Sequence, residues 1–373
     1  MKALFYVQHL LGIGHLQRTL AIAEAAAAAG IASTVVSGGV APSAPRNVRL
    51  IQLPPVRARD ATFSALVDGD GRVIDDAFQA RRRDALLAAF DAVAPDVLIT
   101  ELFPFGRRQL RFEILPLLER AAARAPRPAI VSSVRDILVG NKDEKAADMA
   151  ATARRYYDAV LIHADPAVVK FDDTFPRAPD IADITRYTGY IAPPRPADVG
   201  TRTDVIVSGG GSAVGLRLAA TAIAARPKSR MRNTPWRILV GQGVAEPDFA
   251  ALQASAGAGV TVERTRPDFV ALLAGAALSI SQAGYNTVMD VVAAGPRAIF
   301  VPFYEERQSE QALRAERFAQ RFGYQHVAEA GLTPELLAAA VDRAMAAPVR
   351  AAAIDLNGAR ATAEMLHDVL ARA

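Results

Sequence analysis

Two loops of small residues in the second half of this chain have the residue types that bind anions. Gly209-Gly210-Gly211-Ser212 follows one apolar run, and Ser281-Gln282-Ala283-Gly284-Tyr285-Asn286-Thr287 follows another. Each loop lies where a buried strand is expected to end and a helix to begin, a junction that offers main-chain N–H groups and the positive end of a helix dipole. Glycine has no Cβ, so a phosphate can approach its backbone closely. Together the loops predict a diphosphate-bearing ligand such as a nucleotide sugar.

The second loop leads into a helix, expected over Thr287–Ala294, that carries Asp290. The two oxygens of this carboxylate can accept hydrogen bonds from both hydroxyls of a ribose, as acidic residues do in nucleotide sites. The helix dipole favours a carboxylate at this place even without a ligand, so the residue type alone leaves both interpretations open. We expect Asn286 or Thr287 to cap the helix.

A glycine-containing loop in the first half, Gly12-Ile13-Gly14-His15, follows the first expected strand. The third glycine of a dinucleotide-binding fingerprint is absent, because Gln17 stands in its place, and no acidic residue follows the second expected strand. A nicotinamide site is therefore disfavoured. His15 either caps a tight turn or acts as a base or anion ligand. A phosphate-loop NTPase is also disfavoured, since Ser212-Ala213-Val214-Gly215 contains no lysine.

Composition excludes several other classes of protein. The 373 residues are 51% hydrophobic, carry a net charge of +4 and include no cysteine. That length predicts two folded domains, and the basic balance favours anionic ligands or an anionic membrane surface. Disulfides and thiolate metal sites are excluded, and no paired histidine or Asp-x-Asp cluster stands out as another metal site. No basic block with interleaved aromatic residues indicates nucleic acid, and no long uncharged apolar run predicts a transmembrane helix.

The first half of the chain alternates short apolar runs with alanine-rich helical stretches. This alternation predicts a parallel sheet covered by helices on both faces. The expected strands are 3–7, 33–37, 97–100, 129–132 and 159–162, and the expected helices include 15–29, 81–92 and 112–125.

A proline-rich stretch, Ile191-Ala192-Pro193-Pro194-Arg195-Pro196, precedes a restart of the same pattern. Proline stiffens the chain and cannot donate to a sheet, so this stretch is the expected linker. After it we expect strands at 204–208, 236–240, 260–263, 278–281 and 298–301, with helices at 214–225, 249–254, 287–294 and 308–320. The predicted division is a first domain over 1–192, a linker over 193–203, a second domain over 204–355, and a C-terminal helical segment over 356–373 that can pack on the first domain.

In the small-residue loops of its second half and the glycine loop of its first half, the chain resembles glycosyltransferases of the GT-B architecture. In that architecture two Rossmann-like doubly wound α/β domains face a cleft. It most resembles the family 28 group, which includes the bacterial enzyme that adds N-acetylglucosamine to the peptidoglycan lipid intermediate. It is closer still to a set of uncharacterised predicted glycosyltransferases related to that enzyme. The resemblance covers nearly the whole chain and is strongest over residues 204–320.

The resemblance implies a role for each motif of the second domain. The two loops cradle the donor, and Asp290 stands where the family has a ribose-binding glutamate. The family's His–Gln pair, whose glutamine meets the donor sugar, corresponds here to Glu310-Gln311, so the glutamine is kept and the histidine is replaced. The implied donor-binding residues are Gly12, Gly14, Gly209, Gly210, Gly211, Ser212, Gly284, Tyr285, Asn286, Thr287, Asp290, Glu310 and Gln311.

The first domain corresponds to the acceptor side of the resembling enzymes. The implied catalytic residues are His15, which ends the first glycine loop, and Glu101, which opens the segment Glu101-Leu102-Phe103-Pro104-Phe105-Gly106-Arg107; either of them can take the acceptor proton. Arg107 and Arg108 are candidates for holding an anionic acceptor.

The expected activity is metal-independent transfer of a sugar from a nucleoside diphosphate sugar, a uridine one by preference, to a hydroxyl acceptor with inversion. The alternatives are a nucleotide-sugar 2-epimerase and a non-catalytic nucleotide-sugar-binding protein. No cofactor is expected besides the donor substrate. The acceptor is a small molecule or a lipid-linked saccharide, and the expected location is cytoplasmic, with peripheral contact at the inner membrane face left open.

Overall fold

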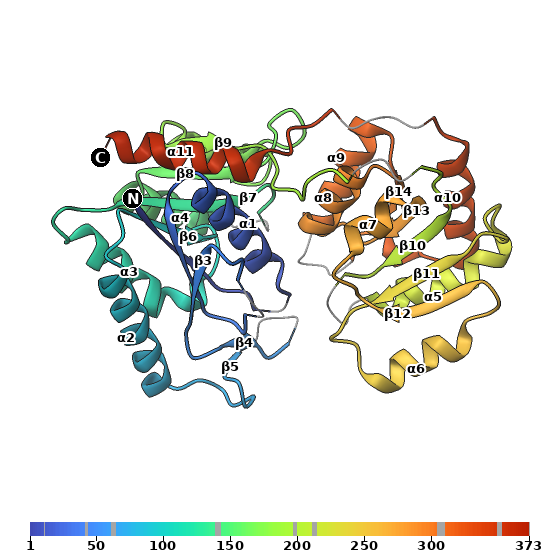
Figure 1. Ribbon diagram of the computed structural model, residues 1–373, viewed down its shortest axis with the longest axis horizontal. Helices are drawn as coiled ribbons and strands as arrows, with labels where there is room; N and C mark the ends of the chain where they lie inside the picture. The colour runs from blue at the N-terminus through green and yellow to red at the C-terminus, as the bar shows by residue number, and fades with distance from the viewer. Residues whose placement is uncertain are drawn as a thin grey trace. The chain divides into compact units, whose positions relative to one another are not determined.

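The computed structural model describes residues 1–10, 12–41, 44–60, 65–138, 143–196, 200–210, 215–303, 310–348 and 353–372. The chain divides into two compact units. Unit 1 comprises Met1–Ile191 and Asn357–Ala373, and unit 2 comprises Ala192–Leu356. Each unit is built on a parallel sheet with helices packed against it, as Figure 1 shows for each half of the chain.

Unit 1 contains a 7-stranded sheet in the order β3-β2-β1-β6-β7-β8-β9, and all its strand pairs are parallel. A short antiparallel pair, β4 with β5, lies outside this sheet. The strands are β1 (Lys2–Val7), β2 (Ala32–Ser37), β3 (Val48–Gln52), β4 (Arg57–Ala58), β5 (Leu66–Val67), β6 (Val97–Glu101), β7 (Ala129–Arg135), β8 (Ala159–His163) and β9 (Thr185–Tyr187).

Helices cover both faces of this sheet because the side chains of its central strand β1 point alternately to the two faces and are apolar on each. In β1, Leu4 and Tyr6 join a core with α2 (Asp76–Val93) and α3 (Arg111–Ala122), whereas Ala3, Phe5 and Val7 join a core with α1 and α11. Figure 1 shows α11 beside α1, with which it is in contact. The remaining helices of unit 1 are α1 (Gly14–Ala28), α4 (Asp143–Tyr156) and α11 (Gly358–Arg372).

Unit 2 contains a 6-stranded parallel sheet in the order β12-β11-β10-β13-β14-β15. Its core includes Trp236, which is fully buried and donates its indole N–H to the Met231 carbonyl over 3.1 Å. The strands are β10 (Asp204–Ser208), β11 (Trp236–Val240), β12 (Val260–Arg264), β13 (Ala276–Ser281), β14 (Arg297–Phe300) and β15 (Gln325–His326). The helices are α5 (Leu216–Ala225), α6 (Glu246–Ser255), α7 (Phe269–Ala274), α8 (Tyr285–Ala294), α9 (Glu310–Phe322) and α10 (Pro334–Ala346).

The two sheets share one doubly wound strand order, with the third, second and first strands followed by the fourth, fifth and sixth. The order reverses between β1 and β6 in unit 1 and between β10 and β13 in unit 2. Ligands of open α/β sheets bind outside the carboxyl ends of the strands at this switch point. The topology therefore places the expected loops after β1, β6, β10 and β13 at the ligand-binding edge of their own sheet.

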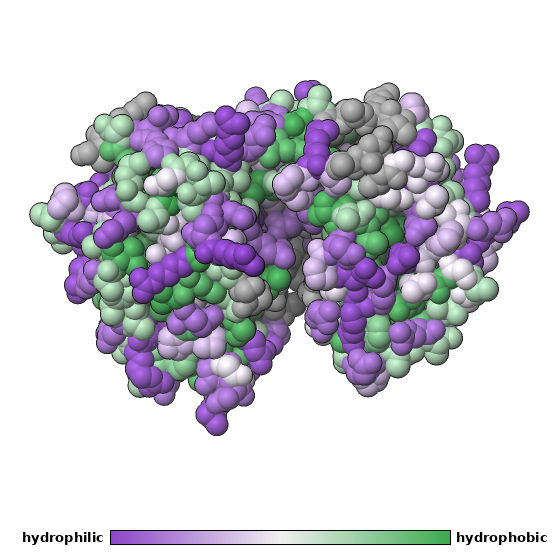
Figure 2. Space-filling model, in the orientation of Figure 1, coloured by the Kyte–Doolittle hydropathy of each residue, from purple (hydrophilic) through white to green (hydrophobic). Residues whose placement is uncertain are grey.

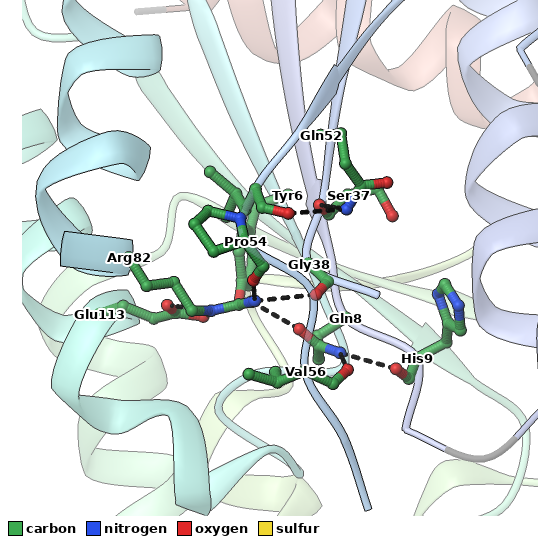
Figure 3. Close-up of polar contacts among 11 residues, drawn as sticks. Tyr6, Gln8, His9, Ser37, Gly38, Gln52, Pro54, Val56, Arg82 and Glu113 are labelled. Atoms are coloured by element: carbon green, nitrogen blue, oxygen red, sulfur yellow. Dashed lines mark hydrogen bonds and ion pairs between the residues drawn. The ribbon is translucent and has the colours of Figure 1, made fainter. Parts of the chain in front are cut away.

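A buried arginine holds the loops at this edge of unit 1 (Figure 3). Arg82 of α2 is fully buried and donates all five of its N–H groups: two to the Glu113 carboxylate, one to Gln8 Oε1, and one each to the carbonyls of Gly38 and Pro54. The Tyr6 hydroxyl also donates to Glu113. Because every donor of the guanidinium has an acceptor, this charge is compensated inside the protein.

The same network fixes the chain that follows β1. Gln8 accepts from Arg82 and donates through Nε2 to the carbonyls of His9 and Val56 at 2.6 and 2.9 Å. A Cβ on Gly38 would lie 2.0 Å from Gln8 Oε1, and one on Gly39 would lie 2.6 Å from the His9 ring. These two glycines are therefore needed for the close packing that leads the chain into the Gly12–His15 loop.

Hydrophilic and hydrophobic residues are interspersed over the face of each unit that Figure 2 shows. Five large apolar residues in the described ranges are exposed: Met1, Ile13, Val40, Val73 and Leu336. Two of them lie at the glycine loops: Ile13 is between Gly12 and Gly14 after β1, and Val40 follows Gly38 and Gly39 after β2. Among the helices within the described ranges, none combines the length and the apolar character needed to cross a membrane.

Substituting Glu113→Gln should destabilise unit 1 by about 3–5 kcal/mol, because it leaves the buried Arg82 charge without its carboxylate partner. The free energy of unfolding from denaturant titration measures this loss. Glu119→Gln on the exposed side of the same helix is the control and should change stability by less than about 0.5 kcal/mol. Equal effects of the two substitutions would contradict the assignment.

Candidate functional site

The carboxyl ends of β1 and β6 bring His15 and Glu101 together. His15 Nδ1 lies 2.6 Å from Glu101 Oε1, and Arg18, one turn further along α1, donates to the same carboxylate oxygen. The Glu101 side chain is 1% exposed and the Arg18 side chain 3%, whereas His15 keeps 19% exposure. The histidine is thus the member of the cluster that solvent reaches.

The carboxylate decides which nitrogen of His15 carries the proton. An ionised carboxylate can only accept, so Nδ1 must donate to Glu101 and Nε2 keeps its lone pair. The 3.2 Å approach of Arg18 Nη2 to Nδ1 is then a contact between two donors that share one acceptor. Within the described residues, hydrogen bonds reach the His15 ring only at Nδ1. Nε2 is therefore free to take a proton from a ligand.

The charges around this pair favour a neutral histidine and an ionised carboxylate. Burial lowers the pKa of His15 to about 3, although Glu101 acts in the opposite direction. Burial acts to raise the pKa of Glu101, but His15, Arg18 and Arg107 outweigh it and hold that pKa well below its ordinary value. At neutral pH the pair is an imidazole oriented by a carboxylate, the arrangement of a general base.

A second layer of polar groups lies next to Glu101 on the neighbouring strands. Ser133 of β7, which pairs with Glu101 in register, contacts His163 Nε2 at 2.7 Å. His163 Nδ1 contacts Thr188 Oγ1 at 2.9 Å, and burial lowers the pKa of this histidine to about 3. This buried chain links β7, β8 and the residue after β9, and burial keeps His163 neutral beside the Arg18–Glu101 pair.

In unit 2, the loop after β10 closes on itself through two glycines. A Cβ on Gly209 would lie 2.3 Å from the Gly215 Cα, and one on Gly215 would lie 2.5 Å from the Gly209 Cα. Gly210 has a φ of 77°, and its N–H donates to Ser208 Oγ over 3.2 Å. A Cβ on Gly210 would meet open space, so this position faces no neighbouring atom within 4 Å. The predicted ligands Gly211 and Ser212 lie outside the described residues.

The helices at both switch points begin without a capping side chain. The N-caps of α1, α5 and α8 are Ile13, Gly215 and Gly284, and none has a side-chain capping bond, whereas Asp75 and Thr333 cap α2 and α10. Our expectation that Asn286 or Thr287 caps α8 is wrong, because both residues lie inside its first turn. Among the described residues, the N-cap residue of each of these three helices makes no side-chain capping bond, and anions bind at such helix starts.

Asp290 lies in the second turn of α8 and is half-buried. Burial alone raises the pKa of its carboxyl group to about 7. No hydrogen bond reaches this carboxyl from the described part of the chain. A half-buried acid with a raised pKa and no partner beside a predicted phosphate loop is a candidate for ligand contact.

Helix α9 fixes the loop between β13 and α8. Gln311 Oε1 accepts from the main-chain N–H groups of Ala283 and Phe303, each at 3.1 Å, and Arg314 donates to the Ala283 carbonyl over 2.8 Å. These two donors require the amide oxygen at that position, so the Gln311 NH₂ group points elsewhere and remains available for a sugar hydroxyl. The fully buried Arg314 also lies over the Tyr285 ring.

The predicted residues thus fall into separate sets at the switch points of the two sheets. Unit 1 brings together His15 and Glu101, with Gly12 exposed and Gly14 opening α1. In unit 2, Asn286 and Thr287 lie partly buried in the first turn of α8, while Tyr285 and Glu310 are buried. Sequence reasoning missed Arg18 and Gly215; the i, i+3 spacing of His15 and Arg18 on one helix was the available signal for Arg18.

The described ranges contain no group of three or more His, Cys, Asp or Glu side chains that could hold a metal ion. The site chemistry available there consists of a histidine base, carboxylates, arginines and main-chain amides.

Comparison with known proteins adds a family and a fold. Residues 205–368 match the glycosyltransferase family 28 C-terminal domain. The chain is similar in structure to MurG of Acinetobacter baumannii, with 18% identity, a TM-score of 0.57, and coverage of 99% of this chain and 100% of that one. No curated protein matches the sequence significantly.

Two further similar structures contain nucleotide ligands. The glycosyltransferase VinC in complex with dTDP shares 15% identity and a TM-score of 0.59, over 100% of this chain and 95% of that one. Phytolacca americana UGT2, complexed with UDP-2-fluoro-glucose and pterostilbene, shares 14% identity and a TM-score of 0.57, over 100% and 94%. The chain therefore has the GT-B fold of these solved structures, and the match of residues 205–368 to the glycosyltransferase family 28 C-terminal domain supports sugar transfer as its activity.

Proposed function

We propose that this glycosyltransferase uses a nucleoside diphosphate sugar, a uridine one by preference, and transfers the sugar to a hydroxyl acceptor with inversion at the anomeric carbon. The observation that carries the proposal is the 2.6 Å contact between His15 Nδ1 and Glu101, because it leaves Nε2 as a base at the switch point of unit 1. A general base is what direct displacement by a hydroxyl needs.

The proposed step is a single displacement. The acceptor oxygen forms a bond to the anomeric carbon as the bond from that carbon to the diphosphate oxygen breaks. The acceptor proton moves to His15 Nε2, and the leaving nucleoside diphosphate keeps the bonding electron pair. Glu101 stabilises the imidazolium that forms, and His15 returns to the neutral imidazole beside the ionised Glu101 when the proton leaves to solvent.

The donor side of the proposal rests on unit 2. The loop at Gly209 and Gly210 and the uncapped start of α8 offer main-chain N–H groups to the diphosphate, and this charge stabilisation needs no metal ion. Asp290 would accept from the ribose hydroxyls and the Gln311 amide would donate to the sugar. The nucleoside diphosphates bound to VinC and UGT2 support this class of donor.

The acceptor in this proposal is a small molecule or a lipid-linked saccharide that carries the attacking hydroxyl. A pI of about 9.5 supports contact with an anionic surface. The proposed location is accordingly the cytoplasm, with peripheral contact at the inner membrane face.

Release of the nucleoside diphosphate tests the activity. The purified chain is incubated with uridine and thymidine diphosphate sugars, with and without a panel of hydroxyl acceptors, in buffer containing excess EDTA. Release that requires an acceptor and persists in EDTA supports the proposal. Conversion of the donor sugar without any acceptor would instead indicate an epimerase, and saturable binding without turnover would indicate a binding protein.

His15→Ala should lower turnover by about 100-fold or more while donor affinity stays near that of the wild type, because the base acts only in the transition state. Glu101→Gln should also lower turnover, since an amide can present an N–H and reverse the tautomer. Steady-state rates and calorimetric donor affinity separate the two effects. His326→Ala, at an exposed histidine of β15, is the control. Wild-type turnover in His15→Ala would show that this histidine is only structural.

Donor affinity should fall as the pH is lowered through about 7, the raised pKa of Asp290. The ionised carboxylate accepts both ribose hydroxyls, and protonation removes an acceptor site, so the loss approaches about tenfold per pH unit well below that pKa. Calorimetry with a uridine diphosphate sugar between pH 5.5 and 8.5 measures it. Asp290→Asn should bind weakly and lose the pH dependence, and an unchanged profile in that variant would contradict the role of Asp290.

Gly210→Asp should abolish detectable donor binding with the fold retained, because it adds a negative charge where the diphosphate is expected. Gly200→Asp is a matched control, since Gly200 also has a positive φ, 75° against 77°, and open space at Cβ. Circular dichroism confirms folding and calorimetry measures affinity. Equal donor affinities in the two variants would place the diphosphate elsewhere.

A further inference from the structure

A second arginine at the switch point of unit 1 lacks the partners that a buried arginine needs. The Arg107 side chain is 9% exposed, and its Nε and Nη2 atoms are buried without a hydrogen-bond partner among the described residues. Within the same residues its ion-pair contact is with Glu101 Oε2, which lies 3.9 Å from Nη2, beyond hydrogen-bonding distance. Burial lowers the pKa of the guanidinium, and Glu101 opposes this effect, but an arginine in a protein keeps its charge.

The contrast with Arg82 shows what a structural arginine in this unit looks like. Arg82 is fully buried and places all five N–H groups on acceptors, two of them on a carboxylate. The Arg107 side chain is 9% exposed, and none of its N–H groups donates to an acceptor in the part of the chain that the structure describes. A buried donor without an acceptor costs free energy, so the Arg107 position is unexplained by the folded chain alone.

The charges near Arg107 do not balance either. Glu101 Oε1 already accepts from His15 and Arg18, and no hydrogen bond reaches Glu101 Oε2 from the described residues. One carboxylate therefore serves two arginines within 4.0 Å. Arg135 adds a further positive influence on Arg107. An anion at this place would supply both the missing acceptors and the missing charge.

The backbone holds Arg107 at this place. Arg107 and Leu102, at the two ends of the loop after β6, both have left-handed φ values, 61° and 66°. Such strain in residues other than glycine persists where the surroundings enforce it, and it concentrates at functional sites. Phe105, in the middle of the loop, is buried edge-on against Phe171 and Phe175. The guanidinium is thus carried by an anchored loop.

We propose that Arg107 binds an anionic group, a carboxylate or a phosphate, of the sugar acceptor, next to the hydroxyl that His15 deprotonates. The unpaired Glu101 Oε2 accepts a hydrogen bond from a hydroxyl of the same ligand. The acceptor class is therefore a hydroxylated acid. This assignment rests on the proposed function, because it names the substrate class of that same site.

Small anions test the site without any sugar transfer. The full chain is titrated with inorganic phosphate and with glycolate at constant ionic strength, and the thermal midpoint and calorimetric affinity are measured. Both anions should stabilise the wild type, and Arg107→Ala should weaken their binding by about tenfold or more, as expected when charge-assisted hydrogen bonds are lost. If Arg107→Ala does not fold, Arg107→Gln supplies the same comparison with most of the side-chain volume kept.

Arg49→Ala is the control, because Arg49 is an exposed arginine of β3 in the same unit and carries the same charge. It should bind both anions as the wild type does. Equal losses in the Arg107 and Arg49 variants would reduce the effect to general positive charge, and an unchanged affinity in Arg107→Ala would overturn the assignment. Absence of binding by the wild type up to tens of millimolar anion would overturn it as well.

A repeat titration with saturating uridine diphosphate distinguishes the acceptor from the donor. If Arg107 serves the acceptor, phosphate and glycolate should still bind, and Arg107→Ala should leave the affinity for uridine diphosphate unchanged. Competition by uridine diphosphate, together with its weaker binding to Arg107→Ala, would assign Arg107 to the leaving group and overturn the acceptor assignment. These titrations involve no turnover, so the Arg107 assignment can fail while acceptor-dependent release of the nucleoside diphosphate still supports the proposed function. In the same way, anion binding at Arg107 can be observed even if the release assay fails.

Discussion

The chemistry available in unit 1 depends on one ionised carboxylate at the buried end of β6. Glu101 is 1% exposed, and a charge at that depth persists only with positive partners and hydrogen bonds around it. Arg18 supplies the charge and His15 Nδ1 supplies the second hydrogen bond. If Glu101 were protonated, its hydroxyl could donate, and neither the tautomer nor the orientation of His15 would be fixed. The arginines near Glu101 therefore determine whether a histidine on another element can act as a base.

Unit 2 uses the main chain where unit 1 uses side chains. The Gly209–Gly215 contact shapes the first loop, and α9 holds the second through Gln311 and Arg314, which bind the two main-chain groups of Ala283. Main-chain N–H groups held in this way need no reorganisation when an anion arrives, so their electrostatic contribution is available at once. Burial raises the pKa of the half-buried Asp290 to about 7, so in the proposed donor site this carboxyl is the group through which pH would act on binding.

The sequence predicts those strands and helices that are determined by the residue pattern of a single short segment. Strands β10 and β11 were expected with the bounds that the structure shows, because parallel strands buried on both faces read as continuous apolar runs. The half-exposed edge strand β3, the charged helix α4 and the helices α7 and α10 were not expected, since their patterns are mixed. Glu101 and His15 were each candidates, but their contact spans 86 positions and depends on the β1–β6 pairing, which only the folded chain shows. The close contact of Gly209 with Gly215 is likewise a property of the closed loop, not of the glycine spacing.

Three buried arginines show that the presence or absence of hydrogen-bond acceptors around a guanidinium separates structural from functional roles in this chain. Arg82 has five acceptors, and Arg314 has the Ala283 carbonyl and the face of Tyr285; each holds a loop at a switch point. Folding can explain both arginines, because hydrogen bonds or a ring contact in the folded chain replace the water that each guanidinium loses on burial. Arg107 has neither among the residues that the structure describes, yet the anchored loop after β6 places it beside the carboxylate that orients the base. A fold selected for stability alone would replace such a residue with an apolar one of similar size. Its retention next to Glu101 is most simply explained by a partner that arrives with the substrate.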